Sequence, residues 1–309
     1  MPYTIFDAHC DTIQKLCDTH QHITRNNLHI SLENMSKHRH IQTFALFIDK
    51  KKDPLTPFNR CNQLLDCYFN EINNNFDRIS HCTNASDINN AIKSNKIAAL
   101  LSIEGGEALE GKLENLEYFY NQGVRLMTLT WNYDNEISGS IGETYTRGLT
   151  RFGKETIHKM NDLGMLIDVS HISHQGFWDV VETTNKPIAA THSNAYSLKN
   201  HKRNLNDQQI KAIIQNNGFI GINLYSEFLT DKDCTITDMI RHIEYILALG
   251  GENILGFGSD FDGMDSLPKE IKGIQDIQKI PALLLKLGYS DGLVEKITHK
   301  NFLRLFDIL

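Results

Sequence analysis

The sequence has few of the features that mark secreted, membrane or nucleic-acid-binding proteins. Its 309 residues include only six cysteines, none of them in a C-x-x-C pair, so we expect reduced thiols in a cytoplasmic protein. Lysine and arginine total 31 against 38 aspartates and glutamates, which gives a formal net charge of −7. Because no basic face dominates this count, the composition argues against a nucleic-acid partner and against an anionic membrane surface.

Long apolar runs are also missing. Nowhere do 18 apolar residues follow one another, so we expect no membrane span. Residues 1–7 lack the basic stretch and the apolar stretch of a signal peptide, which again favours the cytoplasm. The 40% of hydrophobic residues exclude wholesale disorder, and the length suffices for one large barrel or two medium domains.

Short apolar runs alternate with stretches of helical spacing, without a repeat of fixed period. Eight runs predict buried strands: 4–8, 43–48, 97–103, 125–130, 165–169, 188–191, 219–223 and 254–258. Alternating strands and helices form right-handed βαβ units, and eight such units close naturally into a (β/α)₈ TIM-type barrel. An open doubly wound sheet is the alternative, but no G-x-G-x-x-G follows the first strand to favour it.

Helices are predicted where apolar residues recur at helical spacing. Such faces occur within 64–72 and 239–247, and a further helix starts near Asn206, a favourable N-cap. The stretch 131–153 is rich in Gly, Ser, Thr and Asn, and we predict a functional loop there after the fourth strand. No linker or change of composition divides the chain, so we expect residues 1–309 to form one α/β domain.

Chemically active side chains follow five of the eight predicted strands. In a barrel, catalytic groups lie just beyond the C-terminal ends of the strands. The residues at these places that could bind a metal are three histidines and three carboxylates: His9, Asp11, Glu104, His171, His192 and Asp260. Imidazole and carboxylate together suit Zn²⁺. Six ligands exceed the need of one tetrahedral ion, whereas a bridging carboxylate lets them hold two ions about 3.5–4 Å apart.

Each of these residues also has an ordinary structural interpretation. A single histidine at a strand end is more often a hydrogen-bonding structural residue than a ligand. Asp7 and Asp168 could hold strand ends or orient a ligand, and Asp262 could shape the turn before Gly263. The convergence of five strand ends nevertheless favours a metal site, because independent structural residues are not expected to fall so regularly.

Seven segments together resemble the membrane dipeptidase (renal dipeptidase) family of zinc peptidases, the M19 metallopeptidases. The segments are DAHCDT at 7–12, SIEGG at 102–106, LTRFGKE at 149–155, LGMLIDVSH at 163–171, THSNAYS at 191–197, HKRN at 201–204 and GFGSDFDG at 256–263. The resemblance runs nearly from end to end and implies a (β/α)₈ barrel with two zinc ions. It implies that Glu104 bridges the ions, and that Arg203 binds the substrate. By the same likeness, one ion is completed by His9, Asp11 and Asp260, and the other by His171 and His192.

One position departs from the mammalian members of that family. They carry a histidine after strand four that contacts the scissile carbonyl, whereas this chain has Trp131 followed by Asn132. A tryptophan at this point resembles the bacterial-type members. Stabilisation of the oxyanion then falls to zinc, Arg203 or another group.

The resulting hypothesis is a zinc-dependent dipeptidase, with L,D-dipeptides among its candidate substrates. A water between two zinc ions loses its proton near neutral pH and attacks the peptide carbonyl. Asp260 is expected to accept this proton and pass it to the leaving amine. Trp131 and Tyr225 are expected to line the substrate pocket. The oligomeric state stays open, with a homodimer the commonest arrangement on general grounds.

Two other functions stay open on the sequence alone. One is different chemistry in a binuclear barrel amidohydrolase, such as amide, lactone or deamination reactions. Many of those enzymes carry His-x-His after strand one and a bridging lysine after strand four, unlike His9-x-Asp11 and Trp131 here. The other is a non-catalytic barrel that binds metal or peptide. Structural zinc sites normally have four ligands and few carboxylates, so six candidate ligands with three carboxylates argue against a non-catalytic barrel.

Overall fold

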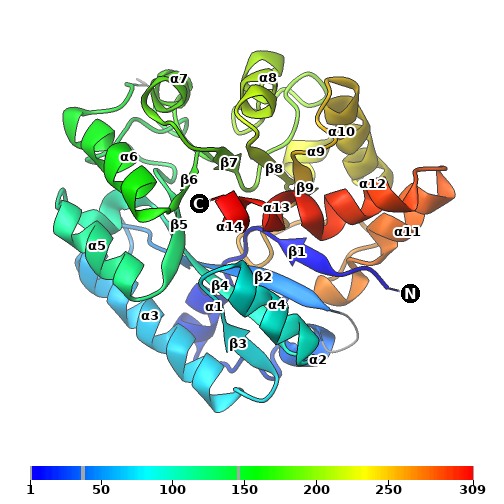
Figure 1. The fold of residues 1–309 in the computed structure, drawn as a ribbon, viewed down its shortest axis with the longest axis horizontal. Coiled ribbons are helices and arrows are strands. Elements are labelled where there is room, and N and C mark those ends of the chain that lie inside the picture. The colour runs from blue at the N-terminus through cyan, green and yellow to red at the C-terminus, as the bar shows by residue number, and fades with distance from the viewer. Residues whose placement is uncertain (1, 36–38, 145–146, 309) are drawn as a thin grey trace.

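The strands form a closed parallel barrel. A computed structural model describes residues 2–35, 39–144 and 147–308, and in this part of the chain nine strands make one sheet in the order β2-β1-β9-β8-β7-β6-β5-β4-β3. An additional pairing of β2 with β4 closes a ring of eight, as predicted (Figure 1). The strands are β1 Ile5–Asp7, β2 His40–Phe47, β3 Ile79–His81, β4 Ile97–Glu104, β5 Val124–Thr128, β6 Leu166–Asp168, β7 Ile188–Ala190, β8 Phe219–Ile222 and β9 Leu255–Phe257.

The ninth strand, β3, was not predicted from the sequence. It pairs with the first residues of β4 (Ile97 to Ala99), on the edge that β5 takes over from Leu101 onward. Since β2 pairs with the other edge of β4, β3 lies beside the ring and is not one of the eight strands of the barrel. Only Ile79 of its three residues is buried, which explains why no apolar run marks it.

Helices surround the ring on all sides (Figure 1). Those predicted from apolar spacing are present as α3 and α10, and Asn206 caps α8 through a capping box with Gln209. The helices are α1 Thr12–Thr19, α2 Leu32–Met35, α3 Pro57–Asn74, α4 Ala85–Lys93, η1 Gly106–Leu109, α5 Leu113–Asn121, α6 Arg151–Leu163, α7 His174–Thr183, α8 Asp207–Gln215, α9 Ser226–Leu229, α10 Ile236–Ala248, η2 Ile274–Asp276, α11 Lys279–Lys286, α12 Asp291–Glu295, η3 Lys296–Lys300, α13 Asn301–Leu303 and α14 Leu305–Ile308.

The predicted loop 131–153 ends earlier than expected, because α6 begins at Arg151. Thr150 caps this helix by accepting a hydrogen bond from the backbone N–H of Gly153. Gly153 is typical of a loop, yet it lies in the first turn of α6. Glycine is needed at this position because a Cβ there would come within 2.1 Å of the Ile137 carbonyl oxygen. Residues 145–146 of the predicted loop lie outside the described residues.

Alternate residues of each strand face two different cores. Along β4, Ala98 and Leu100 belong to a buried cluster inside the ring, whereas Ile97, Ala99 and Leu101 belong to the cluster shared with the helices. Side chains alternate between the faces of a strand, so Glu104 has the same direction as Leu100 and faces the barrel interior. The last residue of this strand therefore presents a carboxylate at the mouth of the barrel.

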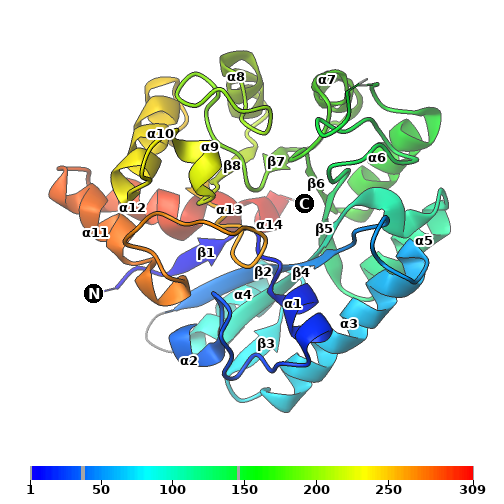
Figure 2. The same ribbon diagram turned by 180° about the vertical axis from the view of Figure 1, so that it is seen from behind.

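The two ends of the barrel differ. At one end, the ring of Phe302 in α13 packs on Phe6 and Phe219, with centroid distances of 4.5 and 4.3 Å. At the other end lie the segments that follow the strands, among them α9 and the loop after β9 (Figure 2). Among the described residues, no helix combines the length and the apolar content that crossing a bilayer requires.

Candidate metal centre

The six residues predicted as metal ligands meet at the mouth of the barrel. They come from five strands of the ring: His9 and Asp11 follow β1, Glu104 ends β4, and the rest follow β6, β7 and β9. Two of them, His171 and Asp260, have positive φ angles of 66° and 62°. Residues other than glycine adopt this conformation uncommonly, and it is enriched at functional sites, where the surrounding fold holds it in place.

The carboxylate of Glu104 faces two separate groups of donors. Its Oε2 lies 3.3 Å from Nε2 of His9. Its Oε1 lies 3.1 Å from Nε2 of His171 and 3.5 Å from Nε2 of His192. One carboxylate with each oxygen turned to a different set of imidazoles has the arrangement that a bridging ligand between two ions requires.

The first donor group consists of His9, Asp11 and Asp260. Both carboxylates approach Nε2 of His9 at 3.8 Å. His9 is completely buried, and neither of its ring nitrogens has a hydrogen-bond partner in the described part of the chain. Oδ1 of Asp11 is likewise buried without a partner there. Buried polar atoms are rarely left unpaired, so this group fits a divalent cation that all three side chains would bind.

The charges in this group also fit a bound cation. Burial, together with the nearby carboxylate of Asp11, raises the pKa of Glu104 to about 8 and that of Asp260 to about 7. Burial opposes protonation of His9, but the carboxylates of Glu104 and Asp11 outweigh it and raise the pKa of this imidazole well above its ordinary value. A bound cation would compensate these crowded carboxylates in place of protons.

The second donor group is a pair of imidazoles. Nε2 of His171 and Nε2 of His192 lie 2.9 Å apart. The hydroxyl of Thr191 donates to Oδ2 of Asp168 at 2.6 Å, so Nδ1 of His192, 2.9 Å from the same hydroxyl, must donate to it.

Nδ1 of His171 donates to Oδ1 of Asn132 at 3.0 Å. Both imidazoles therefore present an Nε2 lone pair toward each other and toward Glu104, which excludes a hydrogen bond between them. Burial holds the pKa of both histidines well below its ordinary value, so both stay neutral and able to bind a metal ion.

Two buried aspartates support the ligands without lying among them. Asp168 accepts four hydrogen bonds, from the hydroxyls of Thr128 and Thr191 and from the backbone N–H groups of Ser170 and Thr191. Asp7 accepts from both the backbone N–H and the hydroxyl of Ser259. These contacts hold the ends of neighbouring strands together, and through Thr191 they also fix the tautomer of His192.

The turn after β9 is shaped by the ligands themselves. A Cβ on Gly263 would lie 2.0 Å from Oδ2 of Asp11 and 2.5 Å from Oδ1 of Asp260, so only glycine lets both carboxylates approach. Asp262 accepts hydrogen bonds from the Thr12 hydroxyl and the backbone N–H of His29, which ties this turn to the start of α1.

A cavity of about 180 Å³ opens over the metal ligands. Among its walls are the three side chains predicted to meet the substrate: Trp131, Arg203 and Tyr225. Arg203 is buried, its Nη2 donates to the carbonyl of His192 at 3.3 Å, and burial lowers its pKa only to about 10, so it stays charged. Burial raises the pKa of Tyr225 to about 12, so this phenol keeps its proton at neutral pH.

Several residues of the site were not identified from the sequence. Asn132 and Asn223 orient His171 and Asp260, the latter through a hydrogen bond of 2.9 Å to Oδ2. Asn223 is a polar residue at the end of a predicted strand, and that position is the signal that could have found it. The cavity is also lined by residues of α1, β2 and α9: Gln14, Lys15, Phe47 and Phe228.

Comparison with known proteins gives a consistent result. A family model described as membrane dipeptidase (peptidase family M19) matches residues 2–309. An uncharacterized protein of Klebsiella pneumoniae is 34% identical over 239 residues, which are 74% of this chain and 88% of the relative. An uncharacterized dipeptidase of Schizosaccharomyces pombe is 38% identical over 235 residues, which are 72% of this chain but only 56% of that longer protein.

Two solved structures have the same fold over almost the whole chain. A metallopeptidase from Rhodobacter sphaeroides, liganded with a phosphinate mimic of the dipeptide L-Ala-D-Ala, superposes with a TM-score of 0.90 at 22% identity, covering 99% of both chains. A probable dipeptidase from Pseudomonas aeruginosa gives 0.91 at 18% identity, covering 98% of this chain and 94% of the other. At these identities the two structures support the barrel fold.

Proposed function

We propose a function on one premise: the chain belongs to the membrane dipeptidase family, peptidase family M19. It is accordingly a metallo-dipeptidase, a metal-dependent hydrolase of dipeptides. The proposal itself is narrower. The protein binds two Zn²⁺ ions through its six ligands and cleaves the peptide bond of dipeptides, L,D-dipeptides included. It does so as a single cytoplasmic domain of residues 1–309, with no nucleic-acid or membrane partner and with a homodimer as the expected assembly.

The observation that carries this proposal is the placement of Glu104. Its two oxygens face one group of His9, Asp11 and Asp260 and another of His171 and His192. The mixed nitrogen and oxygen donors suit Zn²⁺. When bound, the ions would act as Lewis acids that polarise the peptide carbonyl and lower the pKa of water toward about 7.

Asp260 is our candidate for the proton transfers. Its Oδ2 accepts a hydrogen bond from Asn223, which fixes the carboxylate plane, while Oδ1 faces the donor group around His9. The residue lines the cavity, where its carboxylate can take a proton from the attacking water and return it to the leaving amine. Glu104 acts together with Asp260, because its two carboxylate oxygens connect the two donor groups.

Arg203 is our candidate for substrate recognition. A guanidinium that stays charged while buried can pair in a bidentate way with the terminal carboxylate of a dipeptide. Trp131, which packs its edge on Phe47 at 4.8 Å, and Tyr225 bound the cavity and limit the length of the substrate. Trp131 cannot supply an imidazole at the carbonyl, so we assign oxyanion stabilisation to the metal ions and Arg203.

The proposal is tested by hydrolysis of a panel of L,L- and L,D-dipeptides. Protein loaded with Zn²⁺ and a chelated sample are compared with ninhydrin detection, and metal content is measured in both. We expect cleavage that the chelator abolishes, with an L,D to L,L ratio that describes the pocket around Trp131. No cleavage by protein that holds two zinc ions would contradict the dipeptidase assignment and favour other amide-like substrates or a binding role.

A further inference from the structure

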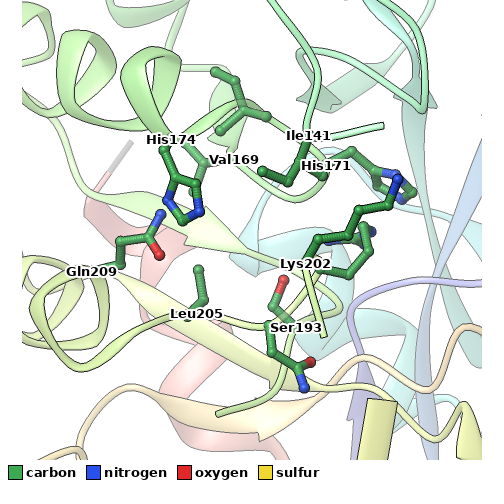
Figure 3. A pocket seen from close by; sticks show the side chains of 11 residues that line it. Ile141, Val169, His171, His174, Ser193, Lys202, Leu205 and Gln209 are labelled. Atoms are coloured by element: carbon green, nitrogen blue, oxygen red, sulfur yellow. The ribbon is translucent and has the colours of Figure 1, made fainter. Parts of the chain in front are cut away.

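A second, much smaller cavity lies behind Arg203. It has a volume of about 20 Å³ and is lined by residues that follow β5, β6 and β7, together with His174 of α7 and Gln209 of α8 (Figure 3). Arg203 and His171 line both this cavity and the larger one over the metal ligands. A space of this size is large enough for one water molecule and too small for any part of a substrate.

Three polar atoms of the residues that line it are buried without a hydrogen-bond partner among the described residues. They are the hydroxyl Oγ of Ser193, Nε of Arg203 and Oδ1 of Asn204. Their residues are 1%, 6% and 3% exposed. An unpaired buried polar atom costs about 1–3 kcal/mol, so three such atoms on residues that line one small cavity favour a shared partner.

The orientation of the Asn204 amide is settled by its other contacts. Nδ2 donates to the carbonyl oxygens of Lys199 and Phe228, each at 2.9 Å, and exchanging the two amide atoms would set oxygen against oxygen. The atom left unpaired is therefore an acceptor.

The residues that line the cavity thus offer one unpaired donor (Nε of Arg203), one unpaired acceptor (Oδ1 of Asn204), and the hydroxyl of Ser193, which can do either. Water satisfies all three, whereas an anion has no proton to offer Oδ1.

We propose that one water molecule binds in this cavity between Ser193, Arg203 and Asn204, and that it orients the guanidinium of Arg203 for the substrate carboxylate. The other polar contact of this guanidinium is a 3.3 Å hydrogen bond from Nη2 to the His192 carbonyl, and its Cζ lies 5.6 Å from the centre of the Phe228 ring. A water on Nε supplies a second fixed point on the guanidinium. Ser193 and Asn204 are then positioning residues, which act through Arg203; this role rests on the proposed function.

Diffraction tests the water itself, independently of any activity. A high-resolution crystal structure of the metal-loaded protein is expected to show one ordered water within hydrogen-bond distance of all three atoms. An anion in the cavity, or no density there, would overturn the inference. If the protein proves inactive on dipeptides, the proposed function fails while this measurement still decides whether the water is bound.

Kinetics tests the positioning role. Ser193→Ala removes one partner of the water, and Val169→Ile adds a methyl group to an apolar side chain that lines the cavity. With either variant we expect KM for a dipeptide with a free carboxylate to rise roughly two- to tenfold, about the effect of one hydrogen bond, with kcat nearly unchanged. For the same dipeptide as its C-terminal amide, which Arg203 cannot clamp, KM is expected to stay at the wild-type value.

A matched control is Ser102→Ala, which removes another fully buried serine hydroxyl, one bonded only to the Phe44 carbonyl among its described contacts. It is expected to leave both KM values unchanged. If Ser193→Ala and Val169→Ile shift KM equally for the acid and the amide, or shift neither, the water does not position Arg203.

Discussion

Replacing Asp168 by asparagine tests whether a residue outside the ligand set decides which nitrogen of His192 can bind metal. In the variant, Oδ1 can keep its hydrogen bonds to the backbone N–H groups of Ser170 and Thr191. The amide nitrogen then replaces the oxygen that accepts from the hydroxyls of Thr128 and Thr191. The Thr191 hydroxyl must turn its proton elsewhere, and Nδ1 of His192 at 2.9 Å is the acceptor in reach. This moves the imidazole proton to Nε2 and removes the lone pair that faces Glu104.

The size of the effect follows from the bonds that are lost. Two hydrogen bonds of 2.6 Å from hydroxyls to a buried carboxylate disappear. Hydrogen bonds to charged groups are worth about 1.5–3 kcal/mol each, and the hydroxyls recover part of this by new contacts, so we expect the free energy of unfolding to fall by about 2–4 kcal/mol. Disturbing the partner of a metal-binding histidine typically lowers metal affinity about 10- to 100-fold, and we expect a loss in this range.

Three measurements check these values. Denaturant unfolding of the metal-free proteins gives the free energy, competition with a chromophoric chelator gives metal affinity, and the ring nitrogen shifts of His192 in NMR spectra report its tautomer. Thr128→Val is the matched control, because Thr128 bonds the same carboxylate oxygen but has no contact with His192 among the described hydrogen bonds. It should lose stability and keep its metal affinity. An Asp168→Asn protein with wild-type affinity and a proton still on Nδ1 of His192 would refute the reasoning.

Three further predictions concern the site and the pH dependence of stability. Gly263→Ala places a methyl group within 2.5 Å of carboxylate oxygens of both Asp11 and Asp260, so we expect elemental analysis of the loaded protein to show reduced metal content; full occupancy would contradict this. Asp260→Asn is expected to lower kcat at least roughly 100-fold with the fold intact by circular dichroism, and a near-wild-type rate with metal bound would remove the proposed proton transfer. Burial lowers the pKa of His81 from its ordinary 6.5 to about 4, so the unfolded chain binds this proton first and stability falls as the pH drops from 6.5 to 4, by up to about 3 kcal/mol. Between pH 6.5 and 4, the free energy of unfolding of His81→Asn should change less with pH than that of the wild type. An equally steep pH dependence in both proteins would show that another group is responsible.

The sequence predicts the ring of strands and points to the candidate ligands because both depend on local patterns. Buried strands in a parallel barrel are short apolar runs, and Glu104 or His192 stands out as a polar residue directly beyond such a run. No strand end marks Arg203, so its role is predicted only from the resemblance of segment 201–204 to the M19 family. The strand β3 was missed because pairing to β4, and not its own three-residue sequence, makes it a strand.

The contacts that support the ligands could not be predicted in the same way. Asn132 and His171 are 39 positions apart, and Asn223 and Asp260 are 37 apart, so their hydrogen bonds depend on how the barrel closes. The tautomer of His192 depends on a chain of proton positions through Thr191, which no spacing in the sequence encodes. Burial without a partner, as for Oγ of Ser193, is visible only once the packing is known.

The closure of the barrel through β1 also sets the order of events during synthesis. The first strand of the ring, β1, pairs with the last, β9, and Asp7 accepts a hydrogen bond from Ser259. The first donor group combines residues that follow each of these two strands, such as His9 and Asp260. His9 and Asp260 are about 250 residues apart, so at about 5–20 residues per second the ribosome adds the second some ten to fifty seconds after the first. A nascent chain that does not yet contain Asp260 cannot assemble the first donor group, so a metal ion can bind to that group only after β9 has been made.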